Sequence, residues 1–259
     1  MNYFHIFYQG FYLIMIMMAL LWVLSIIVRN VSIVDLFWGF GFVLTAGFYF
    51  LKTEGSELRK IIVLILVAIW GLRLSLYLAW RNIGDGEDFR YKEFRKKYGK
   101  HYWWVSFFQT FLLQGILMWF ISAPLLGAQF YGRQISIGFL DYAGFFFWLI
   151  GFFFETTGDF QLARFKSGQA NKDKVMDKGL WHFTRHPNYF GDATVWWGFG
   201  FLCFASGSYL PVFGSALMTL IIIKVSGVSL LEKSLKNRKP EYEEYIRKTS
   251  SFVPWFPKK

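Results

Sequence analysis

The sequence predicts an all-α, multi-span membrane helix bundle, on three observations. The 259 residues are 55% hydrophobic and 17% charged, whereas soluble domains are about one quarter charged. Apolar runs that match a bilayer core of about 30 Å recur along the chain. The net charge of +11 lies mainly between those runs, which favours membrane topology over nucleic-acid binding. We therefore expect a single membrane domain over residues 1–259, bound to membrane lipid and not to nucleic acid.

About seven transmembrane helices are expected, because a helix needs about 20 apolar residues to cross the hydrocarbon core. The runs lack the alternation of an outer-membrane barrel. The first run has no basic segment before it and no small-residue cleavage site, so it is interpreted as a retained span. The predicted spans are 6–28, 33–51, 61–81, 107–130, 138–162, 189–205 and 208–231.

The positive charges predict the sidedness. Of the 28 Lys and Arg, 22 are Arg29 or fall in 81–100, 164–185 or 233–259, which this topology places on one side. The positive-inside rule puts that side in the cytosol, so the N-terminus is expected outside and the C-terminus inside. Two hydrophilic loops, 82–106 and 163–188, and the tail 232–259 would then face the cytosol. The tail fits either an amphipathic helix on the membrane interface or a lid over a cofactor.

Ionisable residues within spans are costly and therefore mark candidate functional sites. Glu155, Asp159 and Lys166 fall at about 0°, 40° and 20° around a helix, on one stripe. A second stripe on the third span holds Arg73, Tyr77 and Arg81. Its two arginines also fit interhelical ion pairing, and Arg81 fits snorkelling to the interface.

Three further sets of polar residues are considered as candidate sites. Asp35 begins the second span, where Ser32-x-x-Asp35 also fits a capping box. Pro187 fits the first turn of a helix, so the preceding Arg185 and His186 would flank backbone donors that favour an anion; a plain helix start is the alternative. The single cysteine, Cys203, and four scattered histidines predict neither a disulfide nor a metal site.

Several motifs together resemble the steroid 5-alpha-reductase C-terminal domain superfamily, and most closely a bacterial group of uncharacterised multi-span proteins. The resemblance covers nearly the whole chain, and it is carried by the combination of motifs rather than by any single one. The motifs are VDLFWG at 34–39, GEDFRY at 86–91, GDFQLARFK at 158–166, GLW at 179–181, RHPNYFGD at 185–192 and SFVPWFP at 251–257.

The resemblance implies a seven-helix bundle with NADPH in a cytosol-facing cavity and a lipophilic substrate that enters from the membrane. It implies a bacterial inner membrane and an NADPH-dependent reductase of a C=C bond in a steroid-like, sterol or isoprenoid substrate. No G-x-G-x-x-G follows a strand, so Rossmann-type binding is not expected. The implied cofactor-binding residues are Glu155, Asp159, Lys166, Arg185, His186, Asn188, Tyr189, Asp192, Glu232 and Tyr245, together with Arg73 and Arg81.

The chain departs from the steroid reductases in two places. They carry S-G-A-N where this chain has Arg185-His186-Pro187-Asn188, and they hold the enone carbonyl with a Glu and Tyr pair. Asp35 is the comparable carboxylate here, and we expect it to be the catalytic acid, with Tyr91 or Tyr77 second. A partly buried carboxyl group suits a proton donor.

Two alternatives remain open. The Arg-His-Pro-x-Tyr-x-Gly motif also occurs in membrane methyltransferases that use S-adenosylmethionine, although those usually carry a Glu-Glu pair where this chain has only Glu232. The second alternative is a lipid-binding or transport protein without catalysis. No internal repeat of the kind common in transporters is visible.

Overall fold

The computed structural model describes residues 2–82, 84, 86–132, 136–171, 174–226, 232 and 241–258. Regular structure among them is helical, apart from one isolated β-bridge between Thr184 and Ser250. The chain divides into two compact units, which are described separately below. Unit 1 comprises Met1–Ile137 and Cys203–Gly214, and unit 2 comprises Gly138–Leu202 and Ser215–Lys259.

Helices long and apolar enough to cross a membrane are the main feature of the fold. Within the described residues there are five, and they are compatible with an integral membrane protein: Tyr3–Ile27, Ile33–Lys52, Glu57–Asn82, Phe89–Phe130 and Phe139–Ser167. A shorter apolar run covers Leu210–Lys224. The predicted span 189–205 coincides with the helix Pro187–Ala205, whereas the end of the predicted span 208–231 lies outside the described residues.

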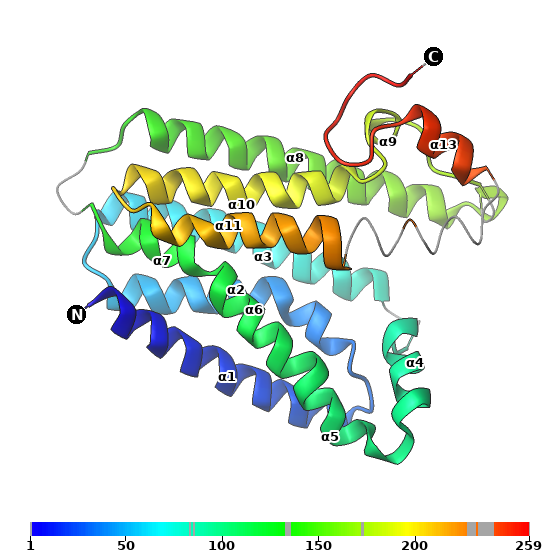
Figure 1. Cartoon of the computed structure of the whole chain (residues 1–259), viewed down its shortest axis with the longest axis horizontal. Coiled ribbons are helices and arrows are strands. Elements are labelled where there is room, and N and C mark those ends of the chain that lie inside the picture. The colour runs from blue at the N-terminus through cyan, green and yellow to red at the C-terminus, as the bar shows by residue number, and fades with distance from the viewer. Residues whose placement is uncertain are drawn as a thin grey trace. The chain divides into compact units, whose positions relative to one another are not determined.

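Unit 1 is built around α1 (Tyr3–Ile27), α2 (Ile33–Lys52) and α3 (Glu57–Asn82), with α2 packed against both other helices (Figure 1). Helices α2 and α3 approach closely because glycines face each other. A Cβ atom on Gly39 would lie 2.3 Å from the carbonyl oxygen of Gly71. Side chains larger than hydrogen are therefore excluded from this crossing.

The predicted span 107–130 is not one regular helix. It comprises a π-helical segment (Phe107–Leu112), α6 (Leu113–Ile121) and α7 (Ala123–Phe130), with a break at Ser122. Pro124 lies in the first turn of α7, where its missing N–H costs no hydrogen bond. The Ser122 hydroxyl donates to the Trp119 carbonyl at 2.7 Å and meets the Tyr49 hydroxyl at 3.0 Å. These bonds hold the break in place.

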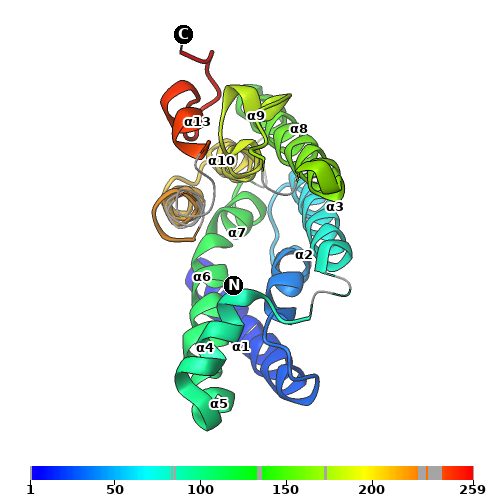
Figure 2. The ribbon, with the colours of Figure 1, turned by 90° about the vertical axis from the view of Figure 1, so that its right-hand side faces the viewer.

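The predicted loop 82–106 contains helices of its own, α4 (Phe89–Tyr98) and α5 (Tyr102–Ser106). Asp88 caps α4 by accepting a hydrogen bond from the Arg90 N–H at 2.9 Å. Figure 2, which looks at this end of unit 1, shows α4 and α5 in front of α1 and α6. Helix α4 therefore closes one end of the unit.

Unit 2 contains α8 (Phe139–Ser167) and most of α10 (Pro187–Ala205), which run antiparallel and side by side (Figure 1). Glycines at a spacing of seven residues line the contact on both helices. Cβ atoms at Gly144, Gly151 and Gly198 would each lie within 3.0 Å of the opposite helix, and one at Gly191 would lie 2.3 Å from the Glu155 nitrogen. The two backbones are therefore in direct van der Waals contact.

Two basic residues that lie between the predicted spans 33–51 and 61–81 are buried. Arg59 and Lys60 lie in the first turn of α3 and are 0% and 4% exposed. Lys60 donates to the Thr53 carbonyl at 2.8 Å and to Glu57 at 3.1 Å. Their charges are therefore held within unit 1.

Candidate functional site

The C-terminal segment of unit 2 is bound to the segment that precedes α10. It contains α13 (Tyr242–Lys248), which lies beside α9 (Leu180–Phe183) in both views (Figures 1 and 2). The Arg185 N–H donates to the Ser250 carbonyl at 2.9 Å, and the Thr184 hydroxyl donates to the Phe252 carbonyl at 2.8 Å. The Trp255 N–H donates to the Phe183 carbonyl at 2.9 Å. The tail is thus hydrogen-bonded to protein at Ser250, Phe252 and Trp255.

Arg185 is the centre of a buried ionic cluster. Its side chain is 7% exposed, and Nη2 lies 2.7 Å from the Glu232 carboxylate. Nη1 donates to the Ile246 carbonyl at 3.1 Å and also to that of Thr249. His186 Nε2 meets the same Glu232 oxygen at 3.2 Å. A planar guanidinium suits this arrangement because it donates in several fixed directions.

Electrostatics in this cluster favour the ionised form of Glu232. Burial raises the pKa of its carboxyl group. Hydrogen bonds and charges from His186 and Arg185 lower the pKa by a larger amount, so the net pKa is below its ordinary value. Burial raises the pKa of Tyr245, whose hydroxyl donates to the Trp181 carbonyl. The cluster therefore contains a carboxylate and a neutral phenol at neutral pH.

The buried carboxylates of α8 face α10. Glu155 is 3% and Asp159 6% exposed. Asn188, in the first turn of α10, donates from Nδ2 to the Asp159 carboxylate at 3.1 Å. Gly191 leaves room for the backbone of Glu155. The structure thus brings Glu155, Asp159 and Asn188 together at the α8–α10 contact.

The other predicted residues of unit 2 occupy less buried positions. Lys166 is exposed in the last turn of α8, and Asp192 is half-buried on α10. The Tyr189 ring stacks on His186 at 5.5 Å between centroids. Tyr189 is therefore joined to the Arg185 cluster through His186.

Two buried polar atoms near this cluster lack hydrogen-bond partners in the described part of the chain. They are Oδ1 of Asn188 and Nδ1 of His186, and His186 is 1% exposed. A buried polar atom without a hydrogen-bond partner is costly. A ligand with hydroxyl groups, which both donate and accept, would satisfy both atoms.

Unit 1 contains a separate polar cluster around Asp35. Its Oδ2 accepts a hydrogen bond from the Arg90 guanidinium at 2.7 Å, and its Oδ1 accepts one from the Tyr91 hydroxyl at 2.8 Å. Gln114 lies 3.4 Å from the same hydroxyl. Tyr91 is 4% exposed. The structure thus joins Asp35 and Tyr91, the two residues predicted to be catalytic.

The capping box proposed for Ser32 and Asp35 does not form. The Ser32 hydroxyl instead accepts from the Asp88 N–H at 2.6 Å, and Asp35 is bonded to α4. Asp88 also bonds the Arg90 guanidinium at 2.9 Å. Burial raises the pKa of Asp88. Its hydrogen bonds with Arg90 and the charge of Arg90 lower the pKa by a larger amount, so the net pKa is below its ordinary value. Asp88 is thus a cap for α4 and an ionised partner of Arg90.

Arg73 and Arg81, the two further predicted cofactor residues, belong to unit 1. Arg73 is half-buried within α3. Arg81 is exposed at the end of that helix, over the Tyr77 ring at 5.8 Å, and its Nε lies 3.4 Å from the Asn82 side chain. Arg81 therefore packs along its own helix, as a snorkelling residue does.

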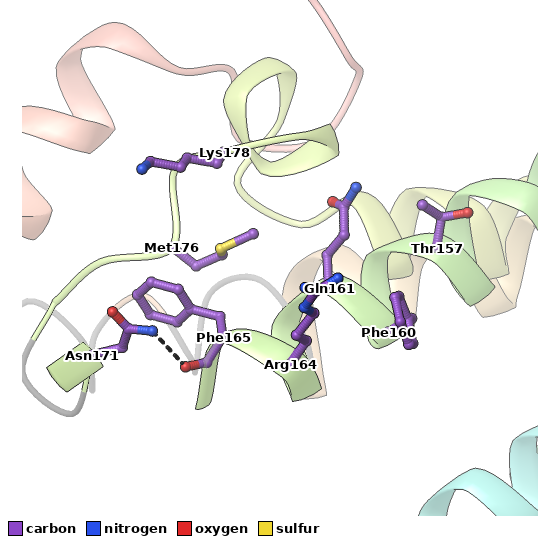
Figure 3. A pocket seen from close by; sticks show the side chains of 8 residues that line it. All are labelled: Thr157, Phe160, Gln161, Arg164, Phe165, Asn171, Met176 and Lys178. Atoms are coloured by element: carbon purple, nitrogen blue, oxygen red, sulfur yellow. Dashed lines mark hydrogen bonds between the residues drawn. The ribbon is translucent and has the colours of Figure 1, made fainter. Parts of the chain in front are cut away.

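A cavity also lies in unit 2, apart from these clusters. It measures about 530 Å³, opens to the surroundings and is lined by Thr157, Phe160, Gln161, Arg164, Phe165, Asn171, Met176 and Lys178 (Figure 3). On α8, Thr157, Gln161 and Arg164 fall about 200°, 240° and 180° from Glu155. The cavity is therefore on the opposite face of α8 from the buried carboxylates.

Sequence reasoning missed three elements of these sites. Arg90 was not singled out, although it lies within the GEDFRY motif. The cavity was not anticipated, because its residues come from a helix face and a loop. The glycine contact of α8 and α10 was also missed, although a seven-residue glycine spacing was visible in the sequence. Within the described residues, no group of three or more His, Cys, Asp or Glu could hold a metal ion.

Comparisons with known proteins identify a family but no chemistry. A family model described as "Protein of unknown function (DUF1295)" matches residues 21–249. The chain is 26% identical over 279 residues to an uncharacterised protein of Schizosaccharomyces pombe, and the match covers 96% of this chain and 79% of the yeast protein. No solved structure matches.

Proposed function

This chain belongs to the DUF1295 family of proteins of unknown function, and we propose that it is an NADPH-dependent membrane reductase. Its substrate would be a C=C bond in a steroid-like, sterol or isoprenoid molecule. The proposal places the chain in the steroid 5-alpha-reductase superfamily, with about seven spans in a bacterial inner membrane and the cofactor on the cytosolic side. The observation that carries it is the 2.8 Å hydrogen bond between Tyr91 and Asp35.

That hydrogen bond supports reduction because reduction of a C=C bond needs a proton as well as a hydride. The steroid reductases hold the carbonyl of their substrate with a carboxylate and a tyrosine, and Asp35 now has a tyrosine partner. Methyl transfer to a lipid nucleophile does not need a buried proton donor. The pair therefore favours reduction over the S-adenosylmethionine alternative.

The roles within the pair follow from Arg90. Arg90 donates to one oxygen of Asp35 at 2.7 Å and Tyr91 donates to the other at 2.8 Å, so both carboxylate oxygens act as acceptors. We therefore assign the proton to the Tyr91 hydroxyl and the positioning of that hydroxyl to Asp35. With substrate bound, the single O–H of Tyr91 would turn from Asp35 to the oxygen of the substrate and stabilise the charge that develops there. Burial of Tyr91 keeps competing water away.

The cofactor would be held by unit 2. NADPH would supply the hydride to the β-carbon of the double bond. Its carboxamide and ribose groups carry N–H and O–H donors, which suit the buried Oδ1 of Asn188 and the carboxylates Glu155 and Asp159. A ribose hydroxyl both donates and accepts, so it also suits Nδ1 of His186. Exposed Lys166 suits a phosphate. Asp192 and Tyr189 complete this set, whereas Arg185, Glu232 and Tyr245 hold the C-terminal segment beside it.

The first experiment is ligand binding to the detergent-purified protein. Thermal shift would be measured with NADPH, NADH and S-adenosylmethionine for the wild type, Asp159→Ala and Glu244→Gln. Glu244 is an exposed carboxylate of the same unit, paired with Lys248, and serves as the control. A shift with NADPH that only Asp159→Ala removes supports the proposal. A shift with S-adenosylmethionine alone would make the protein a methyltransferase.

The second experiment tests the proton donor. Tyr91→Phe removes one hydroxyl and keeps the ring. With a panel of lipid enones, we expect Tyr91→Phe to lower turnover about 100-fold or more, as loss of a general acid does, with NADPH binding unchanged. Full turnover in this variant would exclude Tyr91 as the donor. If a labelled lipid binds and none of the cofactors binds, the protein is a non-catalytic lipid-binding protein.

A further inference from the structure

The cavity on the outer face of α8 combines apolar walls with positive charge. Phe160, Phe165 and Met176 supply the apolar surface, and Arg164 and Lys178 supply two cations. Figure 3 shows the last turns of α8 with Asn171, Met176 and Lys178 from the segment that follows. All of these residues belong to unit 2. The cavity therefore forms without any contribution from unit 1.

The walls of the cavity are fixed by hydrogen bonds. Gln161 accepts from the Leu180 N–H at 3.0 Å, which ties α8 to the start of α9. Asn171 donates to the Phe165 carbonyl at 3.0 Å, as the dashed line in Figure 3 shows. Trp181 donates from its indole N–H to the Gly158 carbonyl at 3.1 Å. The following segment is thus held against α8, and the space between them is preformed.

The order of residues along α8 matches a membrane surface. The helix has 29 residues and is about 43 Å long at 1.5 Å per residue, longer than a hydrocarbon core of about 30 Å. Exposed Phe160 comes first, and exposed Arg164 follows one turn later towards the helix end. Towards the end of α8, the cavity wall therefore changes from apolar to cationic. A membrane changes in the same order, from acyl chains to headgroups.

From this arrangement we propose that the cavity binds an anionic phospholipid. Its phosphate would lie between Arg164 and Lys178, and the first carbons of its acyl chains would contact Phe160, Phe165 and Met176. Two cations in a largely apolar pocket complement a single negative headgroup that carries hydrocarbon. This site is independent of the proposed reductase activity, because Glu155 and Asp159 lie on the other face of α8.

The proposal can be tested with the whole protein in lipid nanodiscs or by native mass spectrometry from detergent. The probe is phosphatidylglycerol, and phosphatidylcholine is the comparison lipid. The double variant R164A/K178A removes both cations. The matched control is K97A/K100A, which removes two exposed basic residues from α4 and the turn after it. A third variant, Met176→Trp, fills the apolar part of the cavity without a change of charge.

Phosphatidylglycerol should bind the wild type and K97A/K100A equally and phosphatidylcholine far more weakly. R164A/K178A should bind phosphatidylglycerol about 30-fold more weakly, because each basic residue near an anionic lipid contributes roughly a factor of five. Met176→Trp should weaken binding too, and inorganic phosphate should not compete. Equal losses in both double variants would overturn the proposal, as would full competition by phosphate, which would indicate a simple anion site.

Discussion

The guanidinium Nη2 of Arg185 lies 2.7 Å from the Glu232 carboxylate, although 47 residues separate them in the chain. The same guanidinium bonds two carbonyls of the C-terminal segment, those of Ile246 and Thr249. One side chain therefore joins the start of α10, Glu232 and the tail. The tail is bound to protein here, whereas the sequence left open a helix on the membrane interface or a lid.

Arg185→Ala should release the C-terminal segment. Removal of one partner of a buried ion pair costs about 3–5 kcal/mol, because the other charge remains without its counterion. We expect amide hydrogen exchange over 241–258 to rise strongly, while exchange in α1 and α2 of unit 1 stays at its wild-type rate. Arg185→Lys keeps the charge and loses the fork of donors, so it should give an intermediate rate. Unchanged exchange in Arg185→Ala would show that the tail is held without this pair.

Acid should open the same contact. The pKa of Glu232 is lowered in the folded protein, so its stabilising contribution is complete above the unfolded pKa of about 4.3 and is lost as the pH falls through the lower, folded pKa. We expect exchange over 241–258 to be constant at neutral pH and to rise, relative to intrinsic rates, below about pH 4. Glu232→Gln should abolish this dependence. The same acid transition in that variant would assign it to another group.

A side chain at the glycine contact of α8 and α10 should destabilise unit 2. In Gly151→Ala, the new Cβ would lie 2.4 Å from the Val195 nitrogen, so the helices must separate. Overpacking of this kind costs about 1–3 kcal/mol, and thermal unfolding in detergent should shift down. Gly47→Ala is the matched control, because nothing lies within 4 Å of its Cβ position on α2. A lowered midpoint in both variants would point to a general effect of helix glycines.

The cap of α4 should control the placement of Tyr91. Asp88→Ala removes the acceptor for the Arg90 N–H, at a cost of about 1 kcal/mol. Asp88→Asn keeps a good cap and loses the charge that faces Arg90. We expect faster hydrogen exchange in α4 for the alanine variant than for asparagine. Equal exchange in the two would assign the stabilisation to the ion pair alone.

The helices were predictable because apolar runs of fixed length report directly on local structure. The predicted helices 33–51 and 138–162 are confirmed as Ile33–Lys52 and Phe139–Ser167. Helix α4 was missed because FRYKEFRKKY has no apolar stripe, and its stability comes from the Asp88 cap and contacts of Arg90. The break at Ser122 was also not predicted, although Pro124 indicated the start of a new helix there.

The site was only partly predictable. The helical period placed Glu155 and Asp159 on one face of α8, where both are buried. The same period placed Lys166 on that face, but Lys166 lies in the last turn of α8 and is exposed. The pairing of Asp35 with Tyr91 joins residues 56 positions apart, and that of Arg185 with Glu232 joins two segments of unit 2. Local patterns contain no information on such distant pairs.

The bonds of Arg185 also impose an order on biosynthesis. The Thr249 carbonyl that it binds lies 64 residues further along the chain. At about 5–20 residues per second, the ribosome makes that acceptor roughly 3–13 s after Arg185. During this interval the guanidinium lacks these carbonyls and must be hydrated or bound to another group. The ionic cluster can therefore close only after the last helix has been made, as a late step in the maturation of the nascent protein.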